Sequence, residues 1–198
     1  MITQEDSLSL THEQCQVLLQ IARAALEAHL GKRPFTPPPP EDTDLWQQAG
    51  VFVTLWLQNE TKPPPYWPQG HLRGCVGHIH SDLPLYQAVA ETAVDAATND
   101  PRFPSLTKAE LNHINLEISL LSPMKPVQQL EEIEIGKHGL LITQGMQRGL
   151  LLPQVAANRK WDRKQFLTAV CAKANLPDTI WPQTARLYAF TTLEFAEQ

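Results

Sequence analysis

The chain has 198 residues, 42% of them hydrophobic and 19% charged, so it is long enough to bury a core and has neither a disordered nor a fibrous composition. Its net charge of −5 argues against general binding to nucleic acids, which requires a concentrated positive field. No stretch approaches the roughly 20 apolar residues of a membrane span, and residues 1–10 lack a signal-peptide pattern, so we expect a cytoplasmic protein. Three cysteines without a C-x-x-C pair suit a reducing compartment and exclude a four-cysteine zinc site within one chain.

The N-terminal part of the chain predicts a helix, an extended connector and a strand. Thr11 and Gln14 have the spacing of a capping box, and apolar residues then recur at helical spacing up to Gly31. Residues 34–40 contain five prolines, which neither helices nor central strands tolerate, so they form an extended connector or a proline motif for a partner. Alternating apolar residues at 51–57 predict a strand.

The middle of the chain predicts two helices and a strand. The stretch LRGCVGHIH occupies residues 72–80 and follows a second proline cluster. Pro84 suits the first turn of a helix, and Thr107 with Glu110 repeats the capping-box spacing and marks a second, short helix. Residues 114–120 alternate between apolar and polar side chains, as in a strand with one buried face.

The C-terminal third predicts a hairpin, two helical segments and a closing strand. Glycines separate the apolar runs within residues 140–152, as in a β-hairpin, and Pro153 opens a helical turn. A capping box at Asp162 starts a helix, and residues 187–195 alternate as one closing strand. Strands and helices in this irregular order indicate an α+β fold with mixed or antiparallel sheets and flanking helices.

One cysteine has a setting that needs a chemical explanation. Cys15 and Cys171 fall on the apolar stripes of predicted helices and belong to the core, whereas Cys75 stands between two glycines. In a regular strand His71, Arg73 and Cys75 share one face, and the guanidinium would then favour the thiolate. The alternative is that Cys75 fills a small gap in the core and the glycines permit tight packing of the strand.

Histidines and a carboxylate provide further candidates. His78 and His80 share the face opposite Cys75 and would need a third ligand such as Asp82 to hold a metal, so we expect no metal site. Glu117 and His138 are candidate acid–base residues. A carboxylate on a solvated sheet face is the commoner explanation for Glu117, whereas for His138 a turn residue with an unusual backbone and a catalytic residue are equal alternatives. No glycine-containing segment has the spacing of a phosphate loop, and we expect no cofactor.

The residues around Cys75 resemble a known family. LRGCVG is similar to the L-R-G-C-I-G signature of the AMMECR domain family, and the resemblance covers about residues 12–195. Four further similar blocks follow in the same order: NDPRFPSLT at 99–107, EISLLSP at 117–123, GKHGL at 136–140 and GLLLPQVA at 149–156. Many members have a small hydroxyl residue and an aromatic residue where His78 and Ile79 stand, which weakens the metal hypothesis.

The resemblance implies a single AMMECR-like domain over residues 1–198, built as two unequal lobes with a cleft between them. Such prokaryotic proteins look like the A component of the AmmeMemoRadiSam set, whose partners are a Memo-like protein and a radical-SAM protein. No settled reaction comes with the family. The motif residues that carry over to this sequence are Arg73, Cys75, Arg102, Glu117, His138 and Gln154.

Two functional hypotheses follow. In the first, the cleft binds a small molecule or a modified peptide segment, Cys75 is the nucleophile or covalent anchor, His138 moves protons and Glu117 assists. The residues expected to bind the substrate are Arg73, Arg102 and Gln154. In the second, the protein is a non-catalytic adaptor for the Memo-like and radical-SAM partners.

Overall fold

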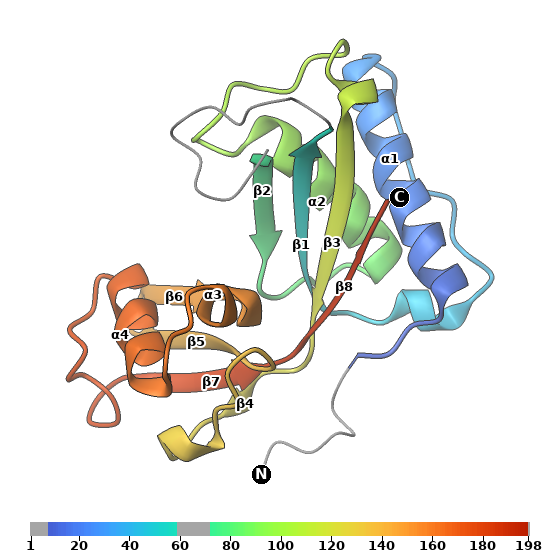
Figure 1. Cartoon of the computed structure of the whole chain (residues 1–198). Helices are drawn as coiled ribbons and strands as arrows, with labels where there is room; N and C mark the ends of the chain where they lie inside the picture. Colours follow the sequence, from blue (N-terminus) through green and yellow to red (C-terminus); the bar gives the residue numbers. More distant parts are fainter. Residues whose placement is uncertain (1–7, 59–71, 198) are drawn as a thin grey trace. The chain divides into compact units, whose positions relative to one another are not determined.

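The computed structural model describes residues 8–58 and 72–197, and the chain divides into two compact units (Figure 1). Of the described residues, the larger unit comprises 9–58, 72–120 and 194–197, and the smaller unit comprises 8 and 121–193. Each contains one four-stranded sheet with helices, and the pairings between strands are antiparallel. The predicted α+β fold class is therefore confirmed, and the cleft between two lobes stays a prediction.

The larger unit places its helices on one face of a sheet with strand order β2-β1-β3-β8 (Figure 1). Its strands are β1 (Gly50–Leu57), β2 (Leu72–His78), β3 (Ile114–Leu121) and β8 (Thr192–Ala196). Its helices are α1 (His12–Leu30) and α2 (Leu85–Thr98), with short 3-10 turns η2 (Thr43–Trp46) and η3 (Leu111–His113). Helix α2 packs against β1 and β2, and α1 packs against α2.

Local sequence signals explain where α1 and α2 begin. The Thr11 hydroxyl accepts the Gln14 backbone N–H at 3.2 Å, and the Gln14 side chain accepts the Thr11 N–H at 2.7 Å, which is the predicted capping box. Pro84 precedes α2 as its N-cap. Both helices bury an apolar stripe, and Cys15 lies in that of α1, as predicted.

The smaller unit packs helices against a sheet with strand order β4-β7-β5-β6. Its strands are β4 (Lys125–Pro126), β5 (Gly139–Gln144), β6 (Gln147–Leu151) and β7 (Arg186–Phe190). Its helical segments are η4 (Leu130–Glu132), α3 (Pro153–Asn158) and α4 (Arg163–Lys173). Phe166, Val170 and Cys171 of α4 are buried with Leu140 and Ile142 of β5, so the unit has its own apolar core and Cys171 belongs to it, as predicted.

Two predicted elements differ from the structure. Residues 187–195 are not one closing strand: β7 and β8 belong to different sheets, and the break falls at Thr191. There the Thr191 backbone exchanges hydrogen bonds of 2.9 Å with the Ser122 backbone and hydroxyl, which alternation of side chains cannot reveal. The short helix expected at Thr107 is a turn leading into η3, because β3 begins directly afterwards at Ile114.

Two glycines allow a helix backbone to approach a strand closely. A Cβ atom at Gly74 in β2 would lie 2.2 Å from the carbonyl oxygen of Ala96 in α2. A Cβ atom at Gly149 in β6 would lie 2.5 Å from the carbonyl oxygen of Val170 in α4. Each unit therefore uses one glycine to bring a helix against its sheet.

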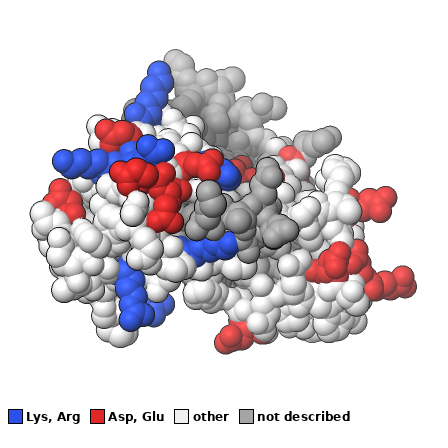
Figure 2. All heavy atoms as spheres, turned by 90° about the horizontal axis from the view of Figure 1, so that it is seen from below, with Lys and Arg blue, Asp and Glu red and all other residues white. Residues whose placement is uncertain are grey.

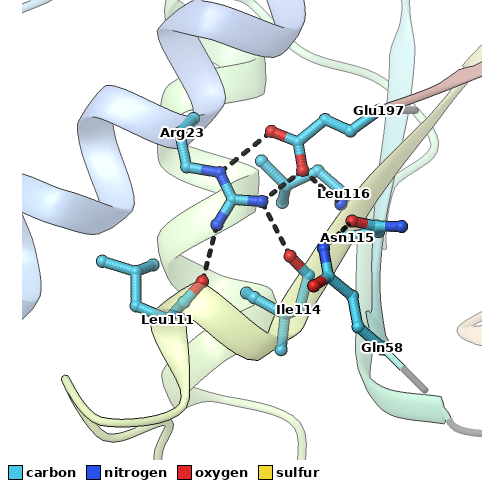
Figure 3. A network of polar contacts seen from close by, with 7 residues as sticks. All are labelled: Arg23, Gln58, Leu111, Ile114, Asn115, Leu116 and Glu197. Atoms are coloured by element: carbon cyan, nitrogen blue, oxygen red, sulfur yellow. Dashed lines mark hydrogen bonds and ion pairs between the residues drawn. The ribbon is translucent and has the colours of Figure 1, made fainter.

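A partly buried ion pair fixes the end of β8 to the rest of the larger unit (Figure 3). The Arg23 guanidinium of α1 donates to both carboxylate oxygens of Glu197 and to the carbonyl oxygens of Leu111 and Ile114, both at 2.9 Å. The same carboxylate accepts the backbone N–H of Leu116 at 2.8 Å. One guanidinium thus joins α1, the start of β3 and the C-terminal strand.

Replacing Arg23 by methionine is expected to lower the free energy of unfolding by about 1 to 2 kcal/mol, because Glu197 and two carbonyl groups lose their donor. The side chains of both partners are about one-fifth exposed, so solvent moderates the loss. Urea denaturation of the wild type and the variant measures the difference. The control is Lys137→Met, which removes an ion pair to Glu134 at the surface and should cost clearly less; equal losses would contradict the special role of Arg23.

Candidate functional site

The side chains of the larger sheet divide into a helix-covered face and a face that we call the helix-free face. Val53 and Leu55 of β1 are fully buried beneath the helices, so the residues that alternate with them point the other way. Thr54 of β1 pairs with Cys75 of β2, which places both side chains on the second face. The helix-free face is defined by Thr54, Trp56, Cys75 and Glu117 together with Glu194 of β8, whose charge acts on Glu117.

Cys75 is held by its neighbours through both its backbone and its sulfur. Its backbone N–H donates to the carboxylate of Asp100 at 2.8 Å, and the Thr54 hydroxyl donates to its Sγ at 3.3 Å. Asp100 is 4% exposed and follows α2, so the end of that helix positions the centre of the strand. Cys75 as a whole residue is partly exposed.

Arg102 is the cation whose charge acts on the pKa of the Cys75 thiol. Its Nε and Nη2 donate to the two oxygens of Asp100 at 2.9 and 2.6 Å, and its Nη2 also reaches the Cys75 carbonyl oxygen at 3.4 Å. Burial would raise the pKa of Asp100, but the hydrogen bonds from Arg102 and Cys75 outweigh burial, and its pKa lies below the usual value. The carboxylate therefore stays charged, and half of the Arg102 side chain remains exposed.

The environment of Cys75 keeps the thiol protonated at neutral pH. Burial raises its pKa above the ordinary value, and the negative charges of Asp100 and Glu117 add to this rise. The hydrogen bond from Thr54 and the charge of Arg102 oppose it without reversing it. The resting site therefore contains a neutral thiol rather than a thiolate.

Arg73 forms an ion pair with Glu110 and not with Cys75. Its Nε and Nη2 donate to the Glu110 carboxylate at 2.7 and 3.2 Å, and the residue is only 7% exposed. This hydrogen bonding lowers the pKa of Glu110 to about 2. The sequence suggested that Arg73 favours the thiolate or holds an anion; in the structure Arg102 lowers the pKa of Cys75, and Arg73 is occupied by Glu110.

A phenylalanine joins the two arginines. The guanidinium carbons of Arg73 and Arg102 lie 5.8 and 5.5 Å from the centre of the Phe103 ring, within the range of cation–π contact. Arg73 sits where the register between β1 and β2 shifts, opposite Leu55 and Trp56, so it does not follow the regular alternation of the strand. His71, which was expected on the same face, lies outside the described residues.

Glu117 lies on the helix-free face at a distance from Cys75. Burial raises its pKa, the charge of Glu194 raises it further, and a hydrogen bond from the Trp56 side chain opposes the rise. Strand β1 separates β2 from β3, so the backbones of Cys75 and Glu117 are roughly 10 Å apart, twice the spacing of neighbouring strands. A molecule bound over β1 could contact both side chains.

His138 and Gln154 belong to the smaller unit. The His138 ring is fully buried, its Nδ1 accepts the Glu134 backbone N–H at 3.0 Å, and burial lowers its pKa, so the neutral ring carries its proton on Nε2. Neither this Nε2 nor Oε1 of Gln154 has a hydrogen-bond partner among the described residues. Because these residues and Cys75 lie in different units, their convergence at one site stays a prediction.

The first of the two histidines after the signature, His78, lies on the predicted face, whereas His80 follows the end of β2 and is not part of the strand. His78 pairs with Val51, on the face that the helices cover, and its Nε2 lies 3.2 Å from Asp95 of α2. Cys75 lies on the opposite face of the sheet, because the pairing of β1 with β2 has no bulge at Gly77 that would reverse the alternation of side chains. Among residues 8–58 and 72–197, no three His, Cys, Asp or Glu side chains form a group that could hold a metal.

Sequence reasoning missed three polar residues of this site: Thr54, Asp100 and Glu110. Asp100 lies in the NDPRFPSLT block, but nothing in that block shows that its carboxylate binds a backbone N–H 25 residues away. The sequence predicted Glu110 as part of a capping box, and its carboxylate does accept the Thr107 backbone N–H at 2.9 Å. The same carboxylate also forms the ion pair with Arg73, which the sequence did not predict. These contacts depend on tertiary structure and have no local pattern.

Comparison with known proteins identifies the family. The family model described as AMMECR1 matches residues 19–195. The chain belongs to the AMMECR1 family. A protein from Thermococcus kodakarensis is 40% identical over 191 residues, covering 92% of this chain and 90% of its own, and one from Pyrococcus furiosus is 38% identical over 190 residues, covering 92% and 88%.

A solved member has the same fold as this AMMECR1-family chain. The crystal structure of an uncharacterized protein from Pyrococcus horikoshii matches it with a TM-score of 0.85 and 34% identity, covering 96% of this chain and 94% of that one. None of these names states an activity, so membership in the AMMECR1 family does not supply a reaction. Within residues 8–58 and 72–197, no helix is both long enough and apolar enough to span a lipid bilayer.

Proposed function

We propose that this AMMECR1-family protein is a cytoplasmic thiol enzyme that acts on a small molecule or a peptide segment bound across the helix-free face. The observation that carries the proposal is the partly exposed residue Cys75, whose backbone is fixed by the buried Asp100 and whose sulfur accepts a hydrogen bond from Thr54. A structural cysteine needs neither contact. Cys15 and Cys171 are buried in apolar cores and show what a packing cysteine looks like in this chain.

The chemistry that suits this site is acyl transfer. The Cys75 sulfur forms a bond to the acyl carbon of the substrate, the bond from that carbon to the leaving group breaks, and the thiol proton is lost to solvent. Glu117, whose raised pKa favours the protonated form compared with an ordinary carboxyl, gives its proton to the leaving group and then regains one from solvent. Water finally cleaves the thioester and releases the acid and the thiol.

Other residues would bind rather than react. Asp100 engages the Nε and Nη2 of Arg102, whose side chain is half exposed, so the Arg102 Nη1 group would donate to a substrate carbonyl or carboxylate. Arg73 would position Phe103 and Glu110 in the segment between α2 and η3. In the smaller unit we retain His138 as a proton carrier and Gln154 as a ligand-binding residue, since each has a buried polar atom without a partner among the described residues.

A second candidate is a non-catalytic adaptor for the Memo-like and radical-SAM partners. The observation in its favour is the raised pKa of Cys75, because a neutral thiol is a weaker nucleophile. The distribution of charge does not favour nucleic acid as the partner: on the face in Figure 2, the Lys and Arg side chains of the described residues stand among acidic and uncharged ones rather than in one basic area.

Acylation of Cys75 distinguishes the two candidates. With p-nitrophenyl acetate as probe, the enzyme hypothesis predicts that intact-protein mass spectrometry shows one acetyl group on Cys75, formed at least about tenfold faster than on N-acetylcysteine at equal thiolate concentration. Glu117→Gln should lower the pKa of Cys75, because it removes the negative charge that Glu117 carries in the pH range in which the thiol ionises. The same variant should not slow acylation by this probe, because p-nitrophenolate leaves without a proton. Thr54→Val should raise that pKa. The pH dependence of iodoacetamide labelling measures both shifts.

The controls use the other cysteines of the chain. Cys75→Ser should abolish rapid acetylation, whereas Cys15→Ser and Cys171→Ser should leave it intact. Acetylation no faster than that of N-acetylcysteine would reject the thiol enzyme. If protein labelled at Cys75 still bound the Memo-like and radical-SAM partners with unchanged affinity, the helix-free face would not be the binding surface of an adaptor either.

A further inference from the structure

A second concave site lies on the helices of the larger unit. It has a volume of about 550 Å³ and is enclosed by the C-terminal turns of α1, the connector at 33–37 and one side of α2. This volume falls in the range of small-molecule pockets, roughly 300–1,000 Å³. None of its lining residues belongs to the helix-free face, so the pocket is separate from the Cys75 site.

The pocket combines an apolar floor with an aromatic rim. Ala25 of α1 and Ala90 of α2 are buried with exposures of 3% and 4%, and the partly buried Val94 continues this surface along α2. Phe35 of the connector stands at the pocket with 36% exposure, high for a large apolar side chain. An aliphatic group placed here would cover surface that now faces water.

Charges of opposite sign line the pocket from two different elements, and both charged residues are exposed to solvent. Arg33 comes from the connector and Glu91 from α2, and the side chain of neither makes a hydrogen bond or ion pair with any described residue. Asp95 lies one turn beyond Glu91 on the same side of α2, and like charges at this spacing repel each other. Among the described residues, the Asp95 carboxylate contacts the His78 ring at 3.2 Å and accepts a hydrogen bond from the Asn99 side-chain amide at 2.8 Å.

We propose that this pocket binds a small zwitterion of the amino-acid class with an aliphatic side chain. The ligand carboxylate pairs with Arg33, its ammonium group pairs with Glu91 and Asp95, and its side chain lies on Ala25, Ala90 and Val94. A ligand with both charges pairs with Arg33 and with the two carboxylates, whereas a ligand with one charge leaves either the guanidinium or the carboxylates unpaired. This inference is independent of the reaction proposed for Cys75.

Titration with leucine and two matched analogues tests the proposal. In ¹⁵N-resolved NMR spectra, leucine should shift the amide signals of residues 29–37 and 87–95 saturably, with a dissociation constant in the millimolar range or below. The analogues are 4-methylpentanoate, which lacks the ammonium group, and 3-methylbutylamine, which lacks the carboxylate. Each should bind at least about tenfold more weakly, since each loses one charge-assisted contact.

Two variants test which side chain binds which charged group of the ligand. Arg33→Gln should weaken leucine and 4-methylpentanoate but not 3-methylbutylamine, and Glu91→Gln should weaken leucine and the amine but not the acid. Lys32→Gln and Glu27→Gln change neighbouring exposed charges outside the pocket and should change nothing. Absence of saturable shifts at 20 mM leucine, equal binding of all three probes, or equal effects of the control variants would overturn the proposal.

Discussion

Gly74→Ala is expected to lower the free energy of unfolding by about 3 kcal/mol or more. The added Cβ would lie 2.2 Å from the Ala96 carbonyl oxygen, and a backbone atom inside a helix cannot turn away as a side chain can. Either α2 must shift from β1 and β2 or β2 must leave its register. Urea denaturation followed by circular dichroism measures the loss.

Gly77→Ala in the same strand is the matched control. There the added Cβ would meet the ring of Phe52, also at 2.2 Å, but this ring can change its rotamer. We expect a loss of about 1 to 2 kcal/mol for this variant. If Gly74→Ala were no worse than Gly77→Ala, close contact with α2 would not be the reason for glycine in the signature.

Glu110→Gln is expected to lower the free energy of unfolding by about 2 to 3 kcal/mol at pH 7. The substitution leaves the Arg73 guanidinium without its counter-charge while the residue stays 7% exposed. One-third of the Glu110 side chain is exposed, so the expected loss is set below that of a fully buried pair. Loss of this pair should also disturb Phe103 and the Arg102 side chain beside Cys75.

The cost of Glu110→Gln should depend on pH in a defined direction. The pKa of Glu110 is about 2 in the folded protein against an ordinary value of 4.5, so the unfolded chain binds the proton more readily. The stabilisation by the carboxylate is therefore complete above about pH 4.5 and is lost as the pH falls towards 2. Urea denaturation of the wild type and Glu110→Gln between pH 7 and pH 2.5 should show that the difference in their free energies of unfolding shrinks below about pH 4.5.

A second carboxylate provides the comparison. Glu134 forms an ion pair with Lys137 at the surface, where solvent screens the charges. Glu134→Gln should change stability far less than Glu110→Gln does. A difference between wild type and Glu110→Gln that stayed constant down to pH 2.5 would show that the loss comes from packing rather than from charge.

The sequence by itself determined the elements whose causes are local. Capping boxes at Thr11 and Asp162 fixed the starts of α1 and α4, because the bonding groups lie within four residues of one another. Strand periodicity separated Cys75 from His78, since side chains alternate whatever the strand packs against. The family followed from short motifs in order, and the α+β class from the mixture of elements.

Only the tertiary structure decided the partners of the charged groups. Cys75 contacts Asp100 across 25 residues and Arg73 contacts Glu110 across 37, so neither pair leaves a pattern in a local window. The sheet to which β8 belongs was likewise invisible, because alternation shows which face of a strand is buried but not which strand lies beside it. The charge state of the thiol depends on those same partners, since desolvation and neighbouring charges are properties of the folded site.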